Sequence, residues 1–242
     1  MINIELLTNK YDPKDYAVDY QQGTPIPWLY FDDFLPDDLL KKIQEEISNI
    51  PRHLFNKFTR NDSFMLECNN LKYAPYTREL TINFNSSEFI TWIENITGLQ
   101  KLIPDPHLIG AGIMECHTGH SLQLHTDYNW NEQLHLNRAI NMILYLSDDW
   151  NPDWGGNLEF WDFECKTILH KVEPRANRLI IWNYNEQLVH GHPTPMSCPE
   201  DVKRIGLRIF YFQSNSKPIN PPHRSLYWFD DKNTPYDRRE NQ

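Results

Sequence analysis

The feature that most constrains this chain is a change of hydrophobic pattern near Leu108. Before it, apolar residues recur at the three- and four-residue spacing of amphipathic helices. After it, short apolar or alternating runs are separated by turn residues, over 108–116, 121–125, 138–146, 157–163, 166–172, 177–183 and 204–213. Strands of this length and spacing are typical of two facing sheets. We therefore predict a mainly β protein with flanking helices that come first in the chain.

The N-terminal part is expected to supply one strand and two helices. Residues 28–34 have the aromatic character of a strand, and Pro36 with the acids after it predicts a helix to about Ile50. A second helix is predicted over 87–98, where Gly98 provides the stop. After Ser214 the chain is proline-rich and is expected to be irregular, with its aromatic cluster at 226–229 docked on the barrel. We predict one domain over 1–242, divided into an N-terminal part at about 26–105, a barrel core at about 106–213 and a tail at 214–242.

Composition narrows the possible partners. The 242 residues are 40% hydrophobic and 13% aromatic, which is enough for a packed core. A formal net charge of −10 disfavours nucleic acid as a partner. The sequence contains no apolar run of membrane-spanning length and no apparent leader, so we expect a cytoplasmic protein without a membrane partner. The four cysteines lack CxxC spacing, which indicates reduced thiols.

The candidate chemistry begins at His125 and Asp127, which end a strand-like run. In an extended chain residues i and i+2 point to one side, so the imidazole and the carboxylate can reach one metal ion. Such a pair also arises by chance in a chain with 10 His and 33 acids. The third ligand is expected at His190 or His192, and we favour His190 because the Gly-His-Pro that follows lets the chain turn away. His192 is then a pocket residue or a turn histidine.

Two histidines and one carboxylate on one face are typical of non-haem Fe(II) oxygenases, because they leave adjacent coordination positions open. A cosubstrate with a distal carboxylate also needs a cation at the far end of its pocket. Arg204 begins the last core strand and can grip a carboxylate with two parallel hydrogen bonds. Arg208 shares its strand face and is the competitor. A salt bridge on the surface of the strand is the alternative for either arginine.

Together these residues resemble the 2-oxoglutarate and Fe(II)-dependent dioxygenases, and among them the prolyl-4-hydroxylase-like branch. The resemblance runs from about Phe31 to Phe212 and rests on ordered blocks: FDDFLP at 31–36, HTDYN at 125–129, NMILYL at 141–146, WGGNLEF at 154–160, HGHP at 190–193 and RIG at 204–206. It implies a double-stranded β-helix, the jelly roll of cupin-like proteins, with N-terminal helices packed on one sheet.

The resemblance also implies roles for particular residues. His125, Asp127 and His190 would be the iron ligands. Arg204 would hold the distal carboxylate of 2-oxoglutarate, with the Tyr145 hydroxyl as a second contact. With O2 as the oxidant and ascorbate as a possible reductant, the expected reaction is hydroxylation of a prolyl, peptidyl or small-molecule substrate, with release of succinate and CO2.

Two departures from the family pattern modify this expectation. Gly206 stands where the family often has serine, and Cys116 stands where it often has tyrosine. Asp127 is retained, which favours hydroxylation over halogenation. Substrate selection is expected in 52–78, in 128–137 and in the tail. Asn129, Trp130 and Trp182 are candidate wall residues, and packing is the more common role of such aromatic residues.

Two other classes of protein use the same residues differently. A metal-dependent cupin enzyme could act without 2-oxoglutarate, although Arg204 argues against it. In a non-catalytic carbohydrate-binding barrel the His-Asp-His set would be accidental.

Overall fold

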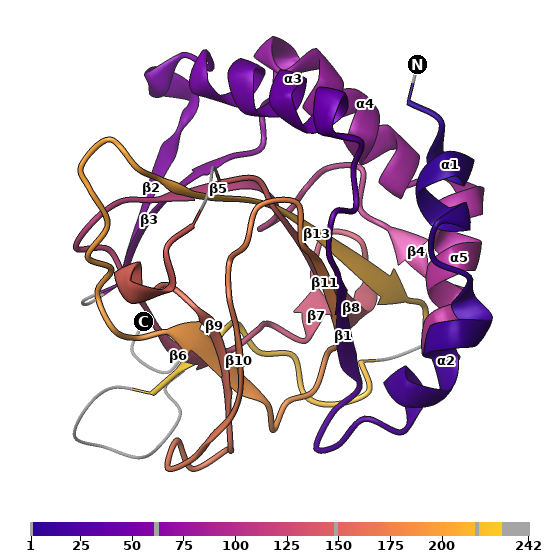
Figure 1. Cartoon of the computed structure of the whole chain (residues 1–242). Helices are drawn as coiled ribbons and strands as arrows, with labels where there is room; N and C mark the ends of the chain where they lie inside the picture. Colours follow the sequence, from indigo (N-terminus) through magenta and orange to yellow (C-terminus); the bar gives the residue numbers. More distant parts are fainter. Residues whose placement is uncertain (1, 61–62, 148–149, 216–217, 229–242) are drawn as a thin grey trace.

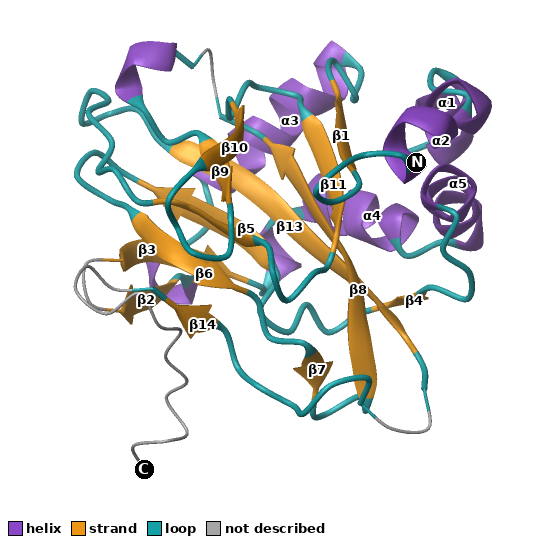
Figure 2. Ribbon diagram, turned by 90° about the horizontal axis from the view of Figure 1, so that it is seen from below, coloured by secondary structure: helices purple, strands orange, loops and turns teal. Residues whose placement is uncertain are grey.

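The computed structural model describes residues 2–60, 63–147, 150–215 and 218–228. In these residues two antiparallel sheets face each other (Figures 1 and 2). The larger sheet has the order β1 (Trp28–Phe31), β11 (Leu179–Asn183), β8 (Leu136–Tyr145), β13 (Arg204–Gln213), β5 (Gly112–Cys116), β3 (Ser63–Cys68) and β2 (Asn56–Arg60), with β4 (Ile103–Pro104) beside β13 and β7 (Trp130–Asn131) beside β8. The smaller sheet has the order β10 (Ile168–Val172), β9 (Leu158–Trp161), β12 (Val189–His192), β6 (Leu122–Thr126) and β14 (Leu226–Tyr227). The predicted double-stranded β-helix is confirmed.

Helices cover the outer face of the larger sheet (Figure 1). These helices are α1 (Ile4–Asn9), α2 (Pro13–Gln21), α3 (Asp37–Ser48), α4 (Pro75–Phe84) and α5 (Ser87–Thr97). Three short 3-10 turns lie in the connections: η1 (Arg52–Leu54), η2 (Leu71–Tyr73) and η3 (Pro152–Trp154). The buried side chains of Ile43, Phe84 and Phe89 share one apolar core with residues of β8 and β13. The N-terminal helices therefore pack on one sheet, as predicted.

Strand β8 shows how one segment serves both faces of the larger sheet. Met142 and Leu144 belong to the core under the helices, whereas Ile143 and Tyr145 belong to the core between the sheets. This alternation follows from the two-residue period of a strand. The barrel interior is therefore lined by every second residue of β8, and the candidate site lies there.

The predicted helices are present with nearly the predicted bounds. Helix α5 begins after Ser86, whose side chain accepts a hydrogen bond from the Phe89 backbone, and it ends at Gly98, which has φ 75°. A left-handed residue at this position favours glycine. Helix α3 begins after Pro36 and carries two acids in its first turn, where they complement the helix dipole.

Several elements were not predicted from sequence. Helix α2 buries only Tyr20, so it has no apolar stripe that periodicity could detect. The β2–β3 hairpin lies within 52–78, and helix α4 extends from this segment to Phe84. Sequence periodicity assigned no element to either of them. The tail adds β14, which pairs with β6, and Trp228 donates its backbone N–H to Leu124. Docking of the cluster is confirmed for 226–228, and Phe229 lies outside the described residues.

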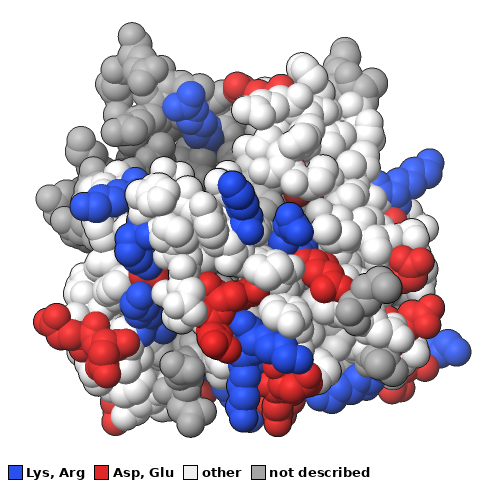
Figure 3. Space-filling model, turned by 90° about the horizontal axis from the view of Figure 1, so that it is seen from above, with Lys and Arg blue, Asp and Glu red and all other residues white. Residues whose placement is uncertain are grey.

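On the face that bears α3, acidic and basic side chains are interleaved (Figure 3), as in the ion pair between Lys42 and Asp38. All four cysteines are free. Within the described ranges, the helices are too short or too polar to cross a bilayer.

Candidate active site

Three predicted metal-binding side chains meet between the two sheets. Strands β6 and β12 are antiparallel neighbours, and their register sets His190 directly opposite His125. Asp127 follows the end of β6. One ligand atom of each residue lies within 4.8 Å of the others. The Nε2 atoms of His125 and His190 are 3.8 and 3.4 Å from the Asp127 carboxylate oxygens.

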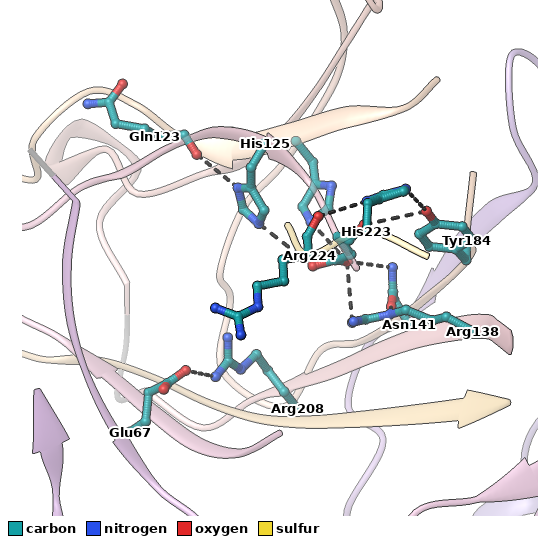
Figure 4. A network of polar contacts seen from close by, with 11 residues as sticks. Glu67, Gln123, His125, Arg138, Asn141, Tyr184, Arg208, His223 and Arg224 are labelled. Atoms are coloured by element: carbon teal, nitrogen blue, oxygen red, sulfur yellow. Dashed lines mark hydrogen bonds and ion pairs between the residues drawn. The ribbon is translucent and has the colours of Figure 1, made fainter. Parts of the chain in front are cut away.

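The rings of both histidines are held in position by neighbours. His125 places Nδ1 2.8 Å from the Gln123 carbonyl, which assigns the proton to Nδ1 and leaves the Nε2 lone pair facing Asp127 (Figure 4). Tyr227 from the tail stacks on the His125 ring with centroids 5.0 Å apart. Trp182 contacts the His190 ring edge-on at 5.7 Å. Such support is typical of metal-binding histidines.

Asp127 is oriented by two residues that sequence reasoning missed. Asn141 donates its Nδ2 to Asp127 Oδ2 at 3.1 Å, and Arg138 Nη2 lies 3.3 Å from the same oxygen. Arg138 in turn donates Nε to Asn141 Oδ1 at 2.6 Å (Figure 4). Both lie on β8, and the signal that could have identified Arg138 is that it is the one charged residue of a strand that is buried throughout.

The protonation states suit a divalent metal. Burial raises the pKa of Asp127, but the positive charge of Arg138 and smaller contributions from its other neighbours outweigh this effect and lower the pKa to about 2. Burial and the neighbouring His190 lower the pKa of His125 to about 3, and burial also lowers the pKa of His190. At neutral pH the set is therefore two neutral imidazoles and one carboxylate. This donor set fits Fe(II) in a facial arrangement.

Arg204 and Tyr145 lie on adjacent strands and contact each other. Arg204 is 2% exposed; it donates Nε to the Gly156 carbonyl at 2.7 Å and Nη2 to the Tyr145 hydroxyl at 3.2 Å. Burial raises the pKa of Tyr145, so its hydroxyl keeps its proton. Gly156 has φ 72°, and a Cβ there would lie 2.7 Å from Met196 Sδ and 3.2 Å from Arg204 Cδ. The Gly-Gly turn therefore has a structural role, as expected.

One cavity joins the two ends of this site. Its walls include the His-Asp-His set, Arg204 and Trp182. His192 also lines it, but a register shift after His190 separates His192 from the metal set, and its Nε2 lies 3.9 Å from Cys116 Sγ.

The remaining candidates fall in different places. Arg208 lines the cavity and also forms an ion pair with Glu67 of β3. Asn129 and Trp130, expected as wall residues, line two neighbouring pockets instead. Asn129 is held by Glu186 and by the Pro221 carbonyl, so it anchors the tail.

Comparison with known proteins agrees with this geometry. Residues 111–212 match the sequence model of the 2OG-Fe(II) oxygenase superfamily. No curated protein matches the chain as a sequence relative.

Solved structures of low sequence identity share the fold. A prolyl hydroxylase from Trichoplax adhaerens in complex with a hypoxia inducible factor peptide has a TM-score of 0.61 at 16% identity, covering 88% of this chain and 94% of that chain. A Pseudomonas putida prolyl-4-hydroxylase has a TM-score of 0.60 at 17% identity, covering 86% and 100%. HygX from Streptomyces hygroscopicus, with nickel, 2-oxoglutarate and hygromycin B bound, has a TM-score of 0.53 at 12% identity, covering 86% and 90%.

The matched segment contains the strands that carry His125, His190 and Arg204. The same fold occurs in the prolyl hydroxylases from Trichoplax adhaerens and Pseudomonas putida. Residues 111–212 are therefore similar in sequence to the 2OG-Fe(II) oxygenase superfamily, and the chain shares its fold with solved prolyl hydroxylases.

Proposed function

We propose that this chain is a 2-oxoglutarate-dependent dioxygenase that acts as a hydroxylase, in which His125, Asp127 and His190 bind Fe(II). Arg204 and the Tyr145 hydroxyl bind the distal carboxylate of 2-oxoglutarate. The observation that carries the proposal is a single cavity with the His-Asp-His set at one end and a buried arginine at the other. We further propose that residues 1–242 act as one domain, with the helices supporting the barrel.

The reaction consumes one C–H bond, one O2 and one 2-oxoglutarate, and it yields one alcohol, one succinate and one CO2. Bound iron supplies the activation of O2 that this oxidation requires, and ascorbate is the expected external reductant. The substrate is a prolyl or peptidyl residue or a small molecule. Solved structures of this fold include both a peptide complex and a hygromycin B complex.

The protein contributes binding, orientation and exclusion of water. Asp127 stays anionic beside Arg138, and its carboxylate is fixed by Asn141. The histidines stay neutral, so their Nε2 lone pairs are available to a metal. At the other end, Arg204 offers a fixed positive charge and Tyr145 a protonated hydroxyl, which together suit a carboxylate. Leu158, Trp182 and Phe210 supply apolar wall.

Equilibrium binding tests these assignments without a known substrate. Wild type is expected to bind one divalent metal, measured by elemental analysis after dialysis, and then 2-oxoglutarate, measured by calorimetry with Zn(II) in place of iron. His125→Ala and His190→Ala should lose the metal, whereas His192→Ala should keep it. Metal bound equally by His190→Ala and wild type would contradict the ligand assignment.

A further inference from the structure

Arg208 is a cation in the cavity that neither the metal nor 2-oxoglutarate explains. It lies on β13 four residues after Arg204, on the same strand face, or about 13 Å along the strand. Its side chain is 13% exposed and lines the cavity. Glu67 receives a hydrogen bond from Nη2 only, and Nε is buried without a hydrogen-bond partner among the described residues. A buried donor without a partner is costly unless a ligand supplies the acceptor.

The charged side chains that line the cavity also do not balance one another. Arg138, Arg204 and Arg208 line it together with a single carboxylate, that of Asp127. If Glu67 is counted with its partner Arg208, three positive and two negative charges leave one positive charge. A bound divalent metal and the dianionic cosubstrate cancel each other. One positive charge therefore remains for another ligand to neutralise.

A second arginine lines a neighbouring pocket. Arg224 belongs to the tail, is exposed and borders a pocket formed with Phe58, Tyr128 and Tyr227. Its guanidinium has no ion-pair partner among the described residues. In Figure 4 the side chains of Arg208 and Arg224 reach toward the same side of His125. Together they place positive charge on that side of His125, which favours an anionic ligand there.

We propose that Arg208 determines substrate specificity by binding a carboxylate of the substrate, so that the enzyme oxidises a small carboxylic acid. This inference rests on the proposed function. The carboxylate accepts a hydrogen bond from the free Nε of Arg208, while Nη2 stays with Glu67. Because Arg208 lies inside the cavity, the oxidised carbon is only a few bonds from the carboxylate.

The test uses the full chain loaded with Zn(II) and 2-oxoglutarate, which cannot turn over. The probes are N-acetyl-proline, N-acetyl-leucine and N-acetyl-phenylalanine, each compared with its carboxamide. Binding is measured by calorimetry and by the arginine Nε–H signals in nitrogen-15 NMR, where the Arg208 signal is assigned by its loss in Arg208→Lys. We expect at least one acid to bind and to shift this signal. Its affinity should exceed that of its amide about tenfold, equivalent to about 1.4 kcal/mol.

Three variants separate substrate binding from a structural role of the ion pair. Arg208→Gln should weaken binding of the acid about tenfold or more and leave 2-oxoglutarate binding unchanged. Glu67→Gln should keep acid binding, because it removes the ion pair but not the guanidinium. Arg78→Gln, on the exposed surface of α4, is the matched control and should behave as wild type.

Each alternative outcome identifies which claim fails. Acids that do not bind, or that bind no better than their amides, would overturn the inference. Equal losses in Glu67→Gln and Arg208→Gln would also overturn it, because the pair would then act only by joining β3 to β13. Failure of the Zn(II) protein to bind 2-oxoglutarate would instead contradict the proposed function.

Discussion

At the residue scale, the site depends on side chains that hold the metal ligands as much as on the ligands themselves. Arg138 keeps Asp127 anionic, and its guanidinium lies 3.5 Å from the centroid of the Phe210 ring, which fixes it in place. Asn141 joins Arg138 to Asp127 through one bond to each. Losing either residue is expected to disturb the metal site without removing a ligand.

Asn141→Ala is expected to weaken metal binding about 10- to 100-fold, since the Asp127 carboxylate loses its amide donor and Arg138 loses its acceptor. Competition with a chelating dye measures this affinity. Gln213→Ala removes an amide that bonds to the Gln100 carbonyl instead, and this control should bind metal as wild type does. Unchanged affinity in Asn141→Ala would show that Asp127 is positioned by other means.

Arg204→Lys is expected to retain the metal but to bind 2-oxoglutarate about tenfold or more less tightly, equivalent to about 1.4 kcal/mol. Lysine keeps the charge, but it lacks the planar fork that bonds Gly156 and Tyr145 while facing a carboxylate. Calorimetry with Zn(II)-loaded protein measures the change. If 2-oxoglutarate binds Arg204→Lys as tightly as wild type, another cation holds the distal carboxylate.

At the element scale, the site depends on the pairing of β6 with β12. Gly191 lies between the two histidines of β12, and a Cβ there would come 2.6 Å from the Leu122 carbonyl oxygen and 3.0 Å from that of Gln123. Both oxygens belong to the backbone of β6, so the clash cannot be relieved by rotating a side chain. A side chain at 191 would therefore push the strands apart.

Gly191→Ala is expected to lower the free energy of unfolding by about 1–3 kcal/mol and to lose metal, because His190 moves away from His125. Urea unfolding and elemental analysis measure the two effects. Gly119→Ala is the control, since φ there is 77° but no atom lies within 4 Å of the added carbon. It should lose stability through backbone strain alone and keep the metal. Full metal content in Gly191→Ala would contradict this account of the strand pairing.

Local pattern predicted most of the barrel, and together with the resemblance it named the candidate site residues that the structure brings together. The alternation of β8 and β13, the His-x-Asp spacing and the resemblance were enough to select His125, Asp127, His190, Arg204 and Tyr145. What periodicity could not show depends on long-range register. The contact of Tyr227 with His125 requires the tail to pair with β6, and the hydrogen bond from Asn141 to Asp127 joins β8 to the segment that follows β6. Helix α2 was missed because its stability comes from packing on α5 rather than from an apolar stripe.

At the scale of the whole molecule, buried neutral histidines couple stability to pH. Burial lowers the pKa values of His125, His190 and His192, whereas in the unfolded chain a histidine has a pKa of about 6.5. Below that pH the unfolded chain binds more protons than the folded one, so acidification destabilises the fold. The stabilisation is complete above about pH 6.5 and is lost as the pH falls toward the folded values, which is about 3 for His125.

Metal-free protein is therefore expected to lose stability between pH 7 and pH 5, by up to about 1.4 kcal/mol per pH unit for each buried histidine. Urea midpoints at a series of pH values, in the presence of a chelator, measure this slope. His192→Gln removes one of the three buried histidines, so it should reduce the slope of stability against pH by the contribution of one histidine. A stability that is flat across this range would show that the histidines are not buried and neutral in the metal-free fold.

The measurement that tests the account most directly is an anaerobic titration with Fe(II) and 2-oxoglutarate, followed by visible absorption. Wild type is predicted to develop a weak charge-transfer band only when both components are present, because the metal and the cosubstrate share one cavity. Asp127→Ala is predicted to show no band. Absence of the band in iron-loaded wild type would contradict the assignment of 2-oxoglutarate to this site, and a full band in Asp127→Ala would contradict the assignment of the metal.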